Sequence, residues 1–334
     1  IYNDTRFGIS QGFSFPGVYV QQKRLLNENY LATQTETKLT AVELTKNVKA
    51  LYYHILAMRE KQKLLLYADS IYEAFLQKAT LRYQKGETNL LEKSTAAASR
   101  SQVANQLQLL QSDMQVALQH FNRLLNDSIP YQPQTGTQLY TNTLPDSAAL
   151  TNTPVLQREA HLVNASMHQW RLERNKLAPD FSVGYNNMSI IGQQNVNGND
   201  VYFNANKRFN TVSAGISIPL FFGSQAARIA AAKKSWLKAQ NDYALITQQV
   251  KTGYDAALAN VTKYRNSLSY YEANTLQHAA TIIETANAQF ARGEISYIEW
   301  TVLLNQSIGI KSDYTDLVNQ YNQAVFELEK ITGN

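Results

Sequence analysis

The placement of seven prolines limits how this chain can fold more than any other feature. They stand at positions 16, 130, 133, 145, 154, 179 and 219. Two long proline-free blocks result, and both are rich in Ala, Leu, Gln, Glu and Lys, which favour helix. Since Gly86 is the one glycine inside the first block after its start, the sequence predicts a long helix over 18–84, a turn at 85–87 and a return helix over 88–126.

The second block repeats this order, with a long helix predicted over 224–291, a turn at 292–294 and a return helix over 295–332. In both long helices apolar residues recur in alternate steps of three and four. The second seam ends with Leu268, Tyr271, Thr275, His278 and Ile282. A sustained period of 3.5 predicts a left-handed coiled coil.

The chain is therefore two copies of one design. Three matches share a displacement of 207 positions: Gly8 with Gly215, Gly86 with Gly293, and Glu92 with Glu299. We assign residues 1–126 to repeat one and 155–334 to repeat two, which opens with a helix over 155–177. The connector over 127–154 carries four of the seven prolines.

Short segments at 4–15 and in a hairpin over 181–218 change to a period of two, typical of strands. One face is apolar, the other carries small polar residues, and a polar loop at 192–208 joins the hairpin arms. This pattern favours a membrane β-barrel with a watery interior over a soluble sheet. The expected lipid-facing residues are Phe7, Ile9, Phe13, Phe15, Phe181, Val183, Tyr185, Val212, Ala214, Ile216 and Ile218.

Repeat one lacks its first strand, which we expect before residue 1 in a longer polypeptide. A signal peptide or lipid anchor there stays open. A full chain would carry four strands, too few to close a barrel, and lipid leaves no strand edge unpaired. Symmetric assembly, with eight strands from two chains or twelve from three, is the expected solution. The fold class is thus mainly α with a small β part.

Composition excludes several functions. The chain has no cysteine, 17% charged residues and a net charge of +5 without a basic run, so neither disulfides nor nucleic-acid binding is expected. No stretch of 18 apolar residues is present. Phosphate-loop, nucleophile-elbow and zinc-protease motifs are also missing, so we expect no enzyme activity, no cofactor and no metal site.

Together these features resemble the TolC-like outer-membrane factor family. The resemblance covers nearly the whole chain and rests on the order of its joints and turns. These are 10–16 and 217–219 (strand to helix), 83–87 and 290–294 (turns between long helices), and 177–181 (entry into a strand). It implies a homotrimer with a 12-stranded barrel in the bacterial outer membrane and a long antiparallel coiled-coil α-barrel in the periplasm.

The resemblance also implies a passive exit duct that works with a periplasmic adaptor (membrane-fusion protein) and an inner-membrane pump of the resistance-nodulation type. The sequence looks most like the ducts of heavy-metal pumps. The family's turns meet the adaptor, which here implies contacts through Lys85, Gly86, Glu87, Arg292, Gly293 and Glu294. An acidic ring in the lumen is implied at Glu299, with Glu92 as its counterpart; the alternative is that both are ordinary solvated helix residues.

Two other functions stay open. One is a type I secretion or drug export duct of the same fold. The other is a soluble coiled-coil scaffold or adaptor, whose strands would form a small capping sheet. The direction of the apolar strand residues distinguishes the scaffold from a duct, because a scaffold would bury them in its own core.

Overall fold

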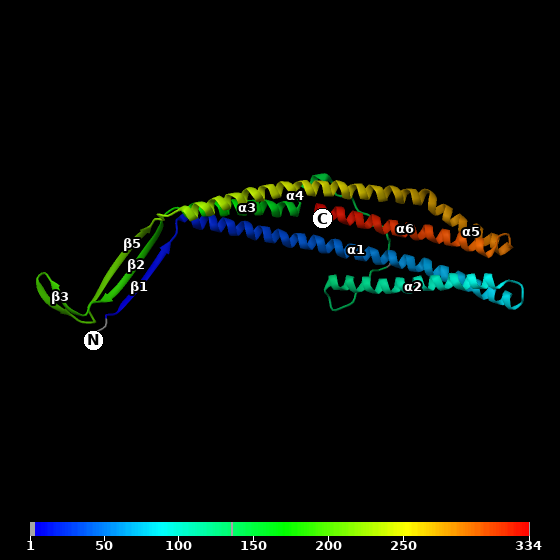
Figure 1. Cartoon of the computed structure of the whole chain (residues 1–334), viewed down its shortest axis with the longest axis horizontal. Coiled ribbons are helices and arrows are strands. Elements are labelled where there is room, and N and C mark those ends of the chain that lie inside the picture. Colours follow the sequence, from blue (N-terminus) through cyan, green and yellow to red (C-terminus); the bar gives the residue numbers. More distant parts are fainter. Residues whose placement is uncertain (1–3, 135, 334) are drawn as a thin grey trace. The chain divides into compact units, whose positions relative to one another are not determined.

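The computed structural model describes residues 4–134 and 136–333. Residues 1–3 and 334, at the outer ends of the two assigned repeats, lie outside this part. The chain divides into two compact units: Ile1–Thr37 with Pro154–Thr247, and Lys38–Thr153 with Gln248–Asn334. The helices α1 (Pro16–Gln84) and α4 (Gly223–Tyr270) contribute residues to both units (Figure 1).

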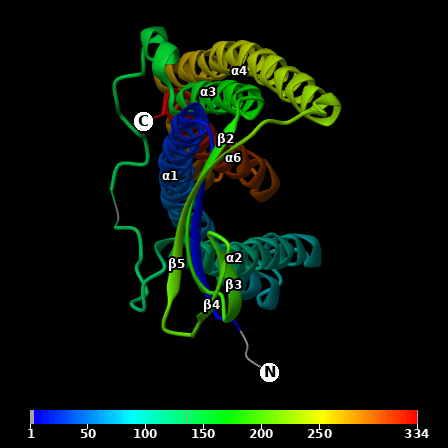
Figure 2. The same cartoon turned by 90° about the vertical axis from the view of Figure 1, so that its left-hand side faces the viewer.

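The first unit contains a three-stranded antiparallel sheet in the order β1-β2-β5. Its strands are β1 (Arg6–Phe13), β2 (Asp180–Ser189) and β5 (Arg208–Ser217), which lie side by side (Figures 1 and 2). The repeat-one strand therefore pairs with the first strand of the repeat-two hairpin. Both edges of this sheet, β1 and β5, have one neighbour each.

The polar loop expected at 192–208 contains more structure than the sequence predicts. It holds a second sheet, made of β3 (Gly192–Val196) and β4 (Asn199–Phe203). Between them Asn197 and Gly198 have φ values of 53° and 88°. An Asn-Gly pair with both φ values positive is the preferred two-residue hairpin turn, which is why these polar residues form strands.

Three helical segments complete the first unit: the start of α1, the start of α4, and α3 (Pro154–Asn175). On α3, Trp170 stacks on Trp236 with ring centroids 5.2 Å apart. The Gln225 amide donates to the backbone oxygen and the carboxylate of Glu173, at 2.8 and 2.9 Å. These contacts join α3 to α4.

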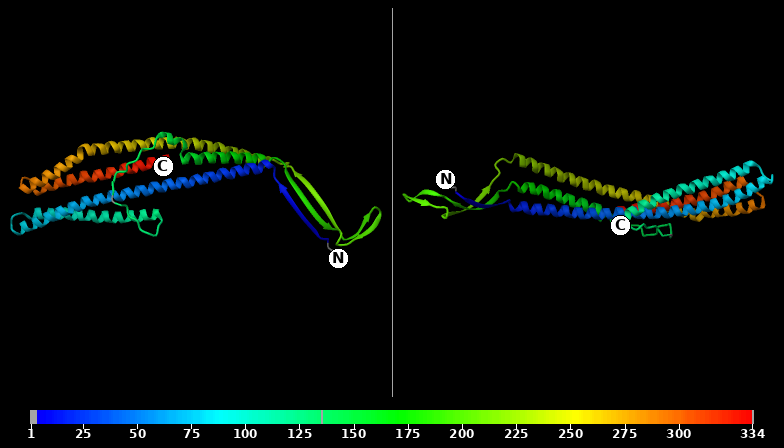
Figure 3. Two further views of the ribbon diagram at one scale, coloured as in Figure 1. Left: turned by 180° about the vertical axis from the view of Figure 1, so that it is seen from behind. Right: turned by 90° about the horizontal axis from the view of Figure 1, so that it is seen from below.

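The second unit packs the remaining lengths of α1 and α4 with α2 (Leu90–Leu125), α5 (Leu276–Arg292) and α6 (Tyr297–Thr332) (Figure 3). One buried cluster lies where α1 meets α2, α5 and α6. In it, the Phe75 ring stacks on Tyr297 at 3.7 Å, and Phe290 stacks on Trp300 at 4.9 Å. The aromatic residues near the two Gly turns thus form a packed core.

The helix expected over 224–291 is not uniform, because a π-helical turn, η2 (Tyr271–Thr275), separates α4 from α5. A π turn holds one more residue than an α turn, so it rotates every following side chain. Leu268, before it, is buried as predicted. After it, the predicted seam residue His278 is exposed and Ala279 is fully buried. The prediction was wrong by one residue for this physical reason.

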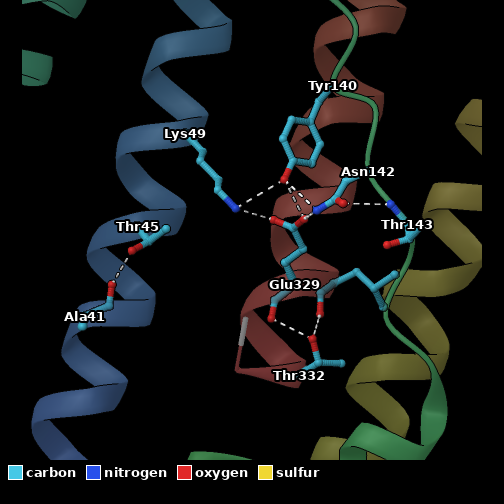
Figure 4. A network of polar contacts seen from close by, with 9 residues as sticks. Ala41, Thr45, Lys49, Tyr140, Asn142, Thr143, Glu329 and Thr332 are labelled. Atoms are coloured by element: carbon cyan, nitrogen blue, oxygen red, sulfur yellow. Dashed lines mark hydrogen bonds and ion pairs between the residues drawn. The ribbon is translucent and has the colours of Figure 1, made fainter.

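The connector lies against the second unit and is mostly extended, with one short 3-10 helix, η1 (Ser147–Asn152). The buried residue Glu329 of α6, 4% exposed, holds the connector in place through its carboxylate. Figure 4 shows the contacts. The Tyr140 hydroxyl donates to the Glu329 carboxylate at 2.9 Å, and Lys49 of α1 donates to it at 2.8 Å. Asn142 adds a third donor at 3.0 Å. A buried carboxylate with three donors is well satisfied, so the connector is firmly attached here.

Candidate functional site

The two faces of the β1-β2-β5 sheet differ chemically, because its register gathers most of the apolar strand residues on one face, where Gln11, Asn187 and Asn210 are the polar members. Ile9 lies opposite Tyr185, which lies opposite Val212. Four residues further along β1, Phe13 lies opposite Phe181, which lies opposite Ile216, and these three form a second apolar row. The predicted lipid-facing residues within the strands therefore share one face.

This apolar face is uncovered in the chain. Ile9 is 73% exposed and Val212 is 76% exposed. The other members predicted to face lipid are also exposed: Phe7, Phe13, Phe15, Phe181, Val183, Tyr185, Ala214, Ile216 and Ile218. None of them points into a core of the chain, which is what a capping sheet would require. A contiguous apolar surface of this kind marks contact with lipid or with another protein.

The opposite face is built from small residues that leave little room. A Cβ placed on Gly184 would come within 2.7 Å of the Ser213 hydroxyl oxygen, and a Cβ on Gly215 within 2.7 Å of the Ser182 hydroxyl oxygen. Because these glycines have no Cβ, the serine hydroxyls of the neighbouring strands fit beside them. The polar face is consequently compact, and its Ser, Asn and Thr groups suit contact with water.

The two predicted Gly turns have the same backbone geometry. Gly86 has a φ of 75° and Gly293 a φ of 74°. In each, the residue after Gly donates its N–H to the carbonyl five positions earlier, Glu87 to Arg82 and Glu294 to Gln289, both at 2.9 Å. This is a Schellman helix end, and the left-handed residue it needs explains why both turns carry Gly.

The charged residues beside these glycines are exposed. At the second turn, Arg292 pairs with Glu294 through two contacts of 2.6 and 3.1 Å. At the first turn, Lys85 and Glu87 form no such pair within the described ranges. The two tips thus share a backbone conformation but present different charges to a partner.

Glu92 and Glu299 occupy equivalent positions, each at the third residue of a return helix. The Ser296 side chain accepts from the Glu299 backbone N–H, and the Glu299 carboxylate accepts from the Ser296 N–H at 2.7 Å. This reciprocal pair is a capping box. Glu92 instead has its backbone N–H bound by the Asn89 side chain, and its carboxylate bonds Arg82 at 3.2 Å and also Thr88.

The ionised form of Glu299 is favoured by its cap. The backbone amide of Ser296, followed by the Ser296 side chain, lowers the pKa of the Glu299 carboxyl. Sequence reasoning missed this role, although Ser296-x-x-Glu299 is a recognised cap signature directly after a turn. Both carboxylates therefore form hydrogen bonds at the start of their own helices. The lumen ring remains a prediction.

Several groups were not found from the sequence. The Lys49, Tyr140 and Glu329 network joins residues far apart along the chain, so no local pattern could reveal it. Across residues 4–134 and 136–333, no group of three or more His, Asp or Glu side chains is arranged to hold a metal ion. In the same residues, no helix combines the length and the hydropathy needed to cross a bilayer.

Solved structures of similar shape are bacterial outer-membrane channels. CmeC of Campylobacter jejuni, an outer membrane channel, has a TM-score of 0.83 at 14% identity, over 99% of this chain and 78% of its own. CusC, studied for transmembrane channel formation, scores 0.82 at 18% identity, over 99% and 83%. VceC, an outer membrane protein of Vibrio cholerae, scores 0.81 at 15% identity, over 98% and 79%. The fold is thus that of a TolC-like channel subunit, mainly α with a small sheet.

A family model described as outer membrane efflux protein matches residues 146–334, more than half of the chain. The chain therefore belongs to the outer membrane efflux protein family. This confirms the family resemblance seen in the sequence. A search of curated protein sequences gave no significant match.

Proposed function

We propose that this chain is the outer-membrane exit duct of a tripartite efflux system and that three copies close one passive channel without catalysis. One observation carries the proposal. The apolar residues of three strands share one exposed face while small polar residues fill the other. Lipid on one side and water on the other account for both faces. β5 is an edge strand of this sheet, and pairing with a strand of a neighbouring copy would satisfy it.

We place the predicted adaptor contact at the two Gly turns. Their support is the shared Schellman geometry and the exposure of the flanking charges. An adaptor that contacts both turns would bind the same backbone conformation at each. The charged side chains differ, because the first turn carries Lys85 and Glu87 and the second carries Arg292 and Glu294. The inner-membrane pump, of the resistance-nodulation type, supplies the energy.

A direct test replaces each turn glycine with proline, because proline cannot adopt a positive φ. Gly86→Pro or Gly293→Pro is expected to abolish export while oligomers still reach the outer membrane. Gly136→Pro is the control, since it lies in the connector with nothing within 4 Å of an added Cβ. Normal export by both turn variants would refute the adaptor role.

The lumen ring is proposed at Glu299, with Glu92 weaker because Arg82 neutralises it. A ring of carboxylates concentrates cations and repels anions. Single-channel recording of Glu299→Gln is expected to give a weaker cation preference. Glutamine keeps a cap acceptor, so the helix end stays intact. An unchanged preference removes the ring.

Heavy-metal cations are the cargo we propose, on the resemblance of the sequence to ducts of heavy-metal pumps. A drug export or type I secretion duct of the same fold is the second candidate. Deletion of the gene separates them: increased sensitivity to metal salts with unchanged drug sensitivity fits the first candidate, and the reverse fits the second.

A further inference from the structure

One cavity that the function above leaves unused lies in the second unit, as an open groove of about 470 Å³ between α1, the end of α2 and α6. Its basic lining groups are Arg123, His120 and His54. No carboxylate lines it. A volume of this size suits a small organic molecule better than a single ion.

The basic groups on α2 are available for a ligand. Both residues are exposed, and within residues 4–134 and 136–333 the side chains of Arg123 and His120 make no hydrogen bond or ion pair. They are three positions apart on one helix, so both reach the same side. Because the guanidinium carries five donors in a fixed fork, Arg123 matches a carboxylate or sulfonate.

The wall formed by α1 and α6 adds neutral donors. Gln323 donates to the Asn319 side-chain oxygen at 3.4 Å, which turns the Asn319 nitrogen toward His54 Nδ1, 3.3 Å away. Because an amide nitrogen can only donate, His54 Nδ1 accepts, so neutral His54 carries its proton on Nε2 and keeps one donor free. Burial is the largest cause that lowers the pKa of His54, and the charge of Lys61 adds to it, while Asp316 and Asp113 oppose it.

The apolar part of the lining comes from Ala50, Leu51 and Leu124, and the amide of Asn47 completes it. A cavity with a basic, donor-rich wall and an apolar part is complementary to a molecule with one anionic group and one hydrophobic body. A carboxylate side chain from another copy would leave most of this volume empty. A metal cation would meet the Arg123 charge.

We propose that this groove is a binding site for amphipathic organic anions, with Arg123 as the charge partner and His120, His54 and Asn319 as further donors. The site goes beyond the duct function, since it needs neither export nor an adaptor. It is also distinct from the Gly turns, because it lies near the C-terminal end of α2 rather than its start.

Calorimetry of the full chain in lipid nanodiscs tests the site. The probe is 1-naphthoate, and 1-naphthylmethylammonium is the matched cation. We expect saturable binding of one naphthoate per chain and no binding of the cation. Arg123→Gln is expected to weaken naphthoate binding by about tenfold or more, because it removes a charged hydrogen-bond donor. His120→Gln, a second variant, is expected to weaken it less, and Arg123→Lys to retain part of it.

Arg100→Gln is the control, the same substitution on the same helix away from the groove, and its affinity is expected to stay within about twofold. Equal binding of the two probes, unchanged affinity in both Gln variants, or stronger binding of Zn²⁺ at this site would overturn the proposal. Loss of the oligomer in Arg123→Gln would also overturn it, by making the groove a contact between copies. Since binding is measured without transport, a failed export assay leaves this result standing.

Discussion

Single side chains at the helix ends have consequences that pH can reveal. The folded pKa of Glu299 is lowered by its cap, so its contribution to stability is present above the unfolded pKa and is lost as pH falls through the folded one. We expect Glu299→Gln to show less loss of helical signal than the wild type on acidification below about pH 5. Circular dichroism across pH 3–7 measures this, with Glu87→Gln as the control, because the Glu87 side chain caps no helix and forms no ion pair within the described ranges. Identical acid profiles for wild type and Glu299→Gln would contradict the capping role.

The ion pair between half-buried Lys49 and buried Glu329 makes a second prediction. Burial alone would lower the pKa of Lys49, but the hydrogen bond and charge of Glu329 outweigh it and raise that pKa. Lys49→Met would leave the Glu329 carboxylate buried with neutral donors only. We expect the free energy of unfolding to fall by about 3 kcal/mol.

The double variant Lys49→Met, Glu329→Leu is the matched test, because it removes both charges. It is expected to recover part of the loss, as measured by urea denaturation of the extracted protein. If the single and double variants are equally destabilised, charge pairing contributes nothing and the contacts act by packing alone.

Residue roles of this kind were only partly predictable. The Gly turns follow from local sequence, since Gly86 and Gly293 stand alone between long helical blocks. The Glu299 cap is equally local, because Ser296-x-x-Glu299 is a capping-box signature directly after the turn, although the cap was not predicted from the sequence. The Glu329 network could not be predicted from the sequence, because its members lie on three segments that only folding brings together.

At the scale of elements, the two faces of the sheet respond differently to charge. Val212 lies in the apolar row with Ile9 and Tyr185, and Thr211 lies next to it on the polar face. An Arg on a lipid face costs about 2–4 kcal/mol at the membrane midplane. We expect Val212→Arg to block assembly in the outer membrane and Thr211→Arg to be tolerated, as measured by heat-modifiable oligomers in membrane fractions. Equal tolerance would argue that lipid does not contact this face.

The π turn between α4 and α5 gives a prediction about helix register. Deleting Asn274, which is exposed within η2, should convert the π turn to an α turn and leave the buried seam in register. Deleting Asn260, which is exposed in the middle of α4, should rotate every later residue out of the seam.

We therefore expect Asn274 deletion to keep helicity and assembly, and Asn260 deletion to lose both. Circular dichroism and the yield of extracted oligomer measure the difference. Comparable damage from both deletions would mean that the π turn has a role of its own beyond absorbing a residue.

Elements were predicted well where periodicity was long and less well where it was short. The helix predicted over 18–84 corresponds to α1 at Pro16–Gln84. The π turn was missed because Tyr271 and Thr275 continue the 3.5-residue pattern in the sequence, while the extra residue appears only in the hydrogen bonding. The β3 and β4 strands were missed because polar residues on an exposed hairpin give no apolar alternation.

For the whole molecule, a closed channel depends on the assembly of several chains. The described part of the chain supplies three strands to the larger sheet, and even the four strands expected of a full chain are too few to close a barrel, so a closed barrel requires other copies. The predicted number of copies follows from the family resemblance, while the exposed apolar face follows from the register. Both claims predict a particle that contains several chains and that requires detergent or lipid to stay in solution.

Native mass spectrometry of the protein extracted from outer membranes measures this most directly. We predict a complex of three chains that is released only by detergent and that aggregates when the detergent is removed. A monodisperse single chain that stays in solution without detergent would contradict the account.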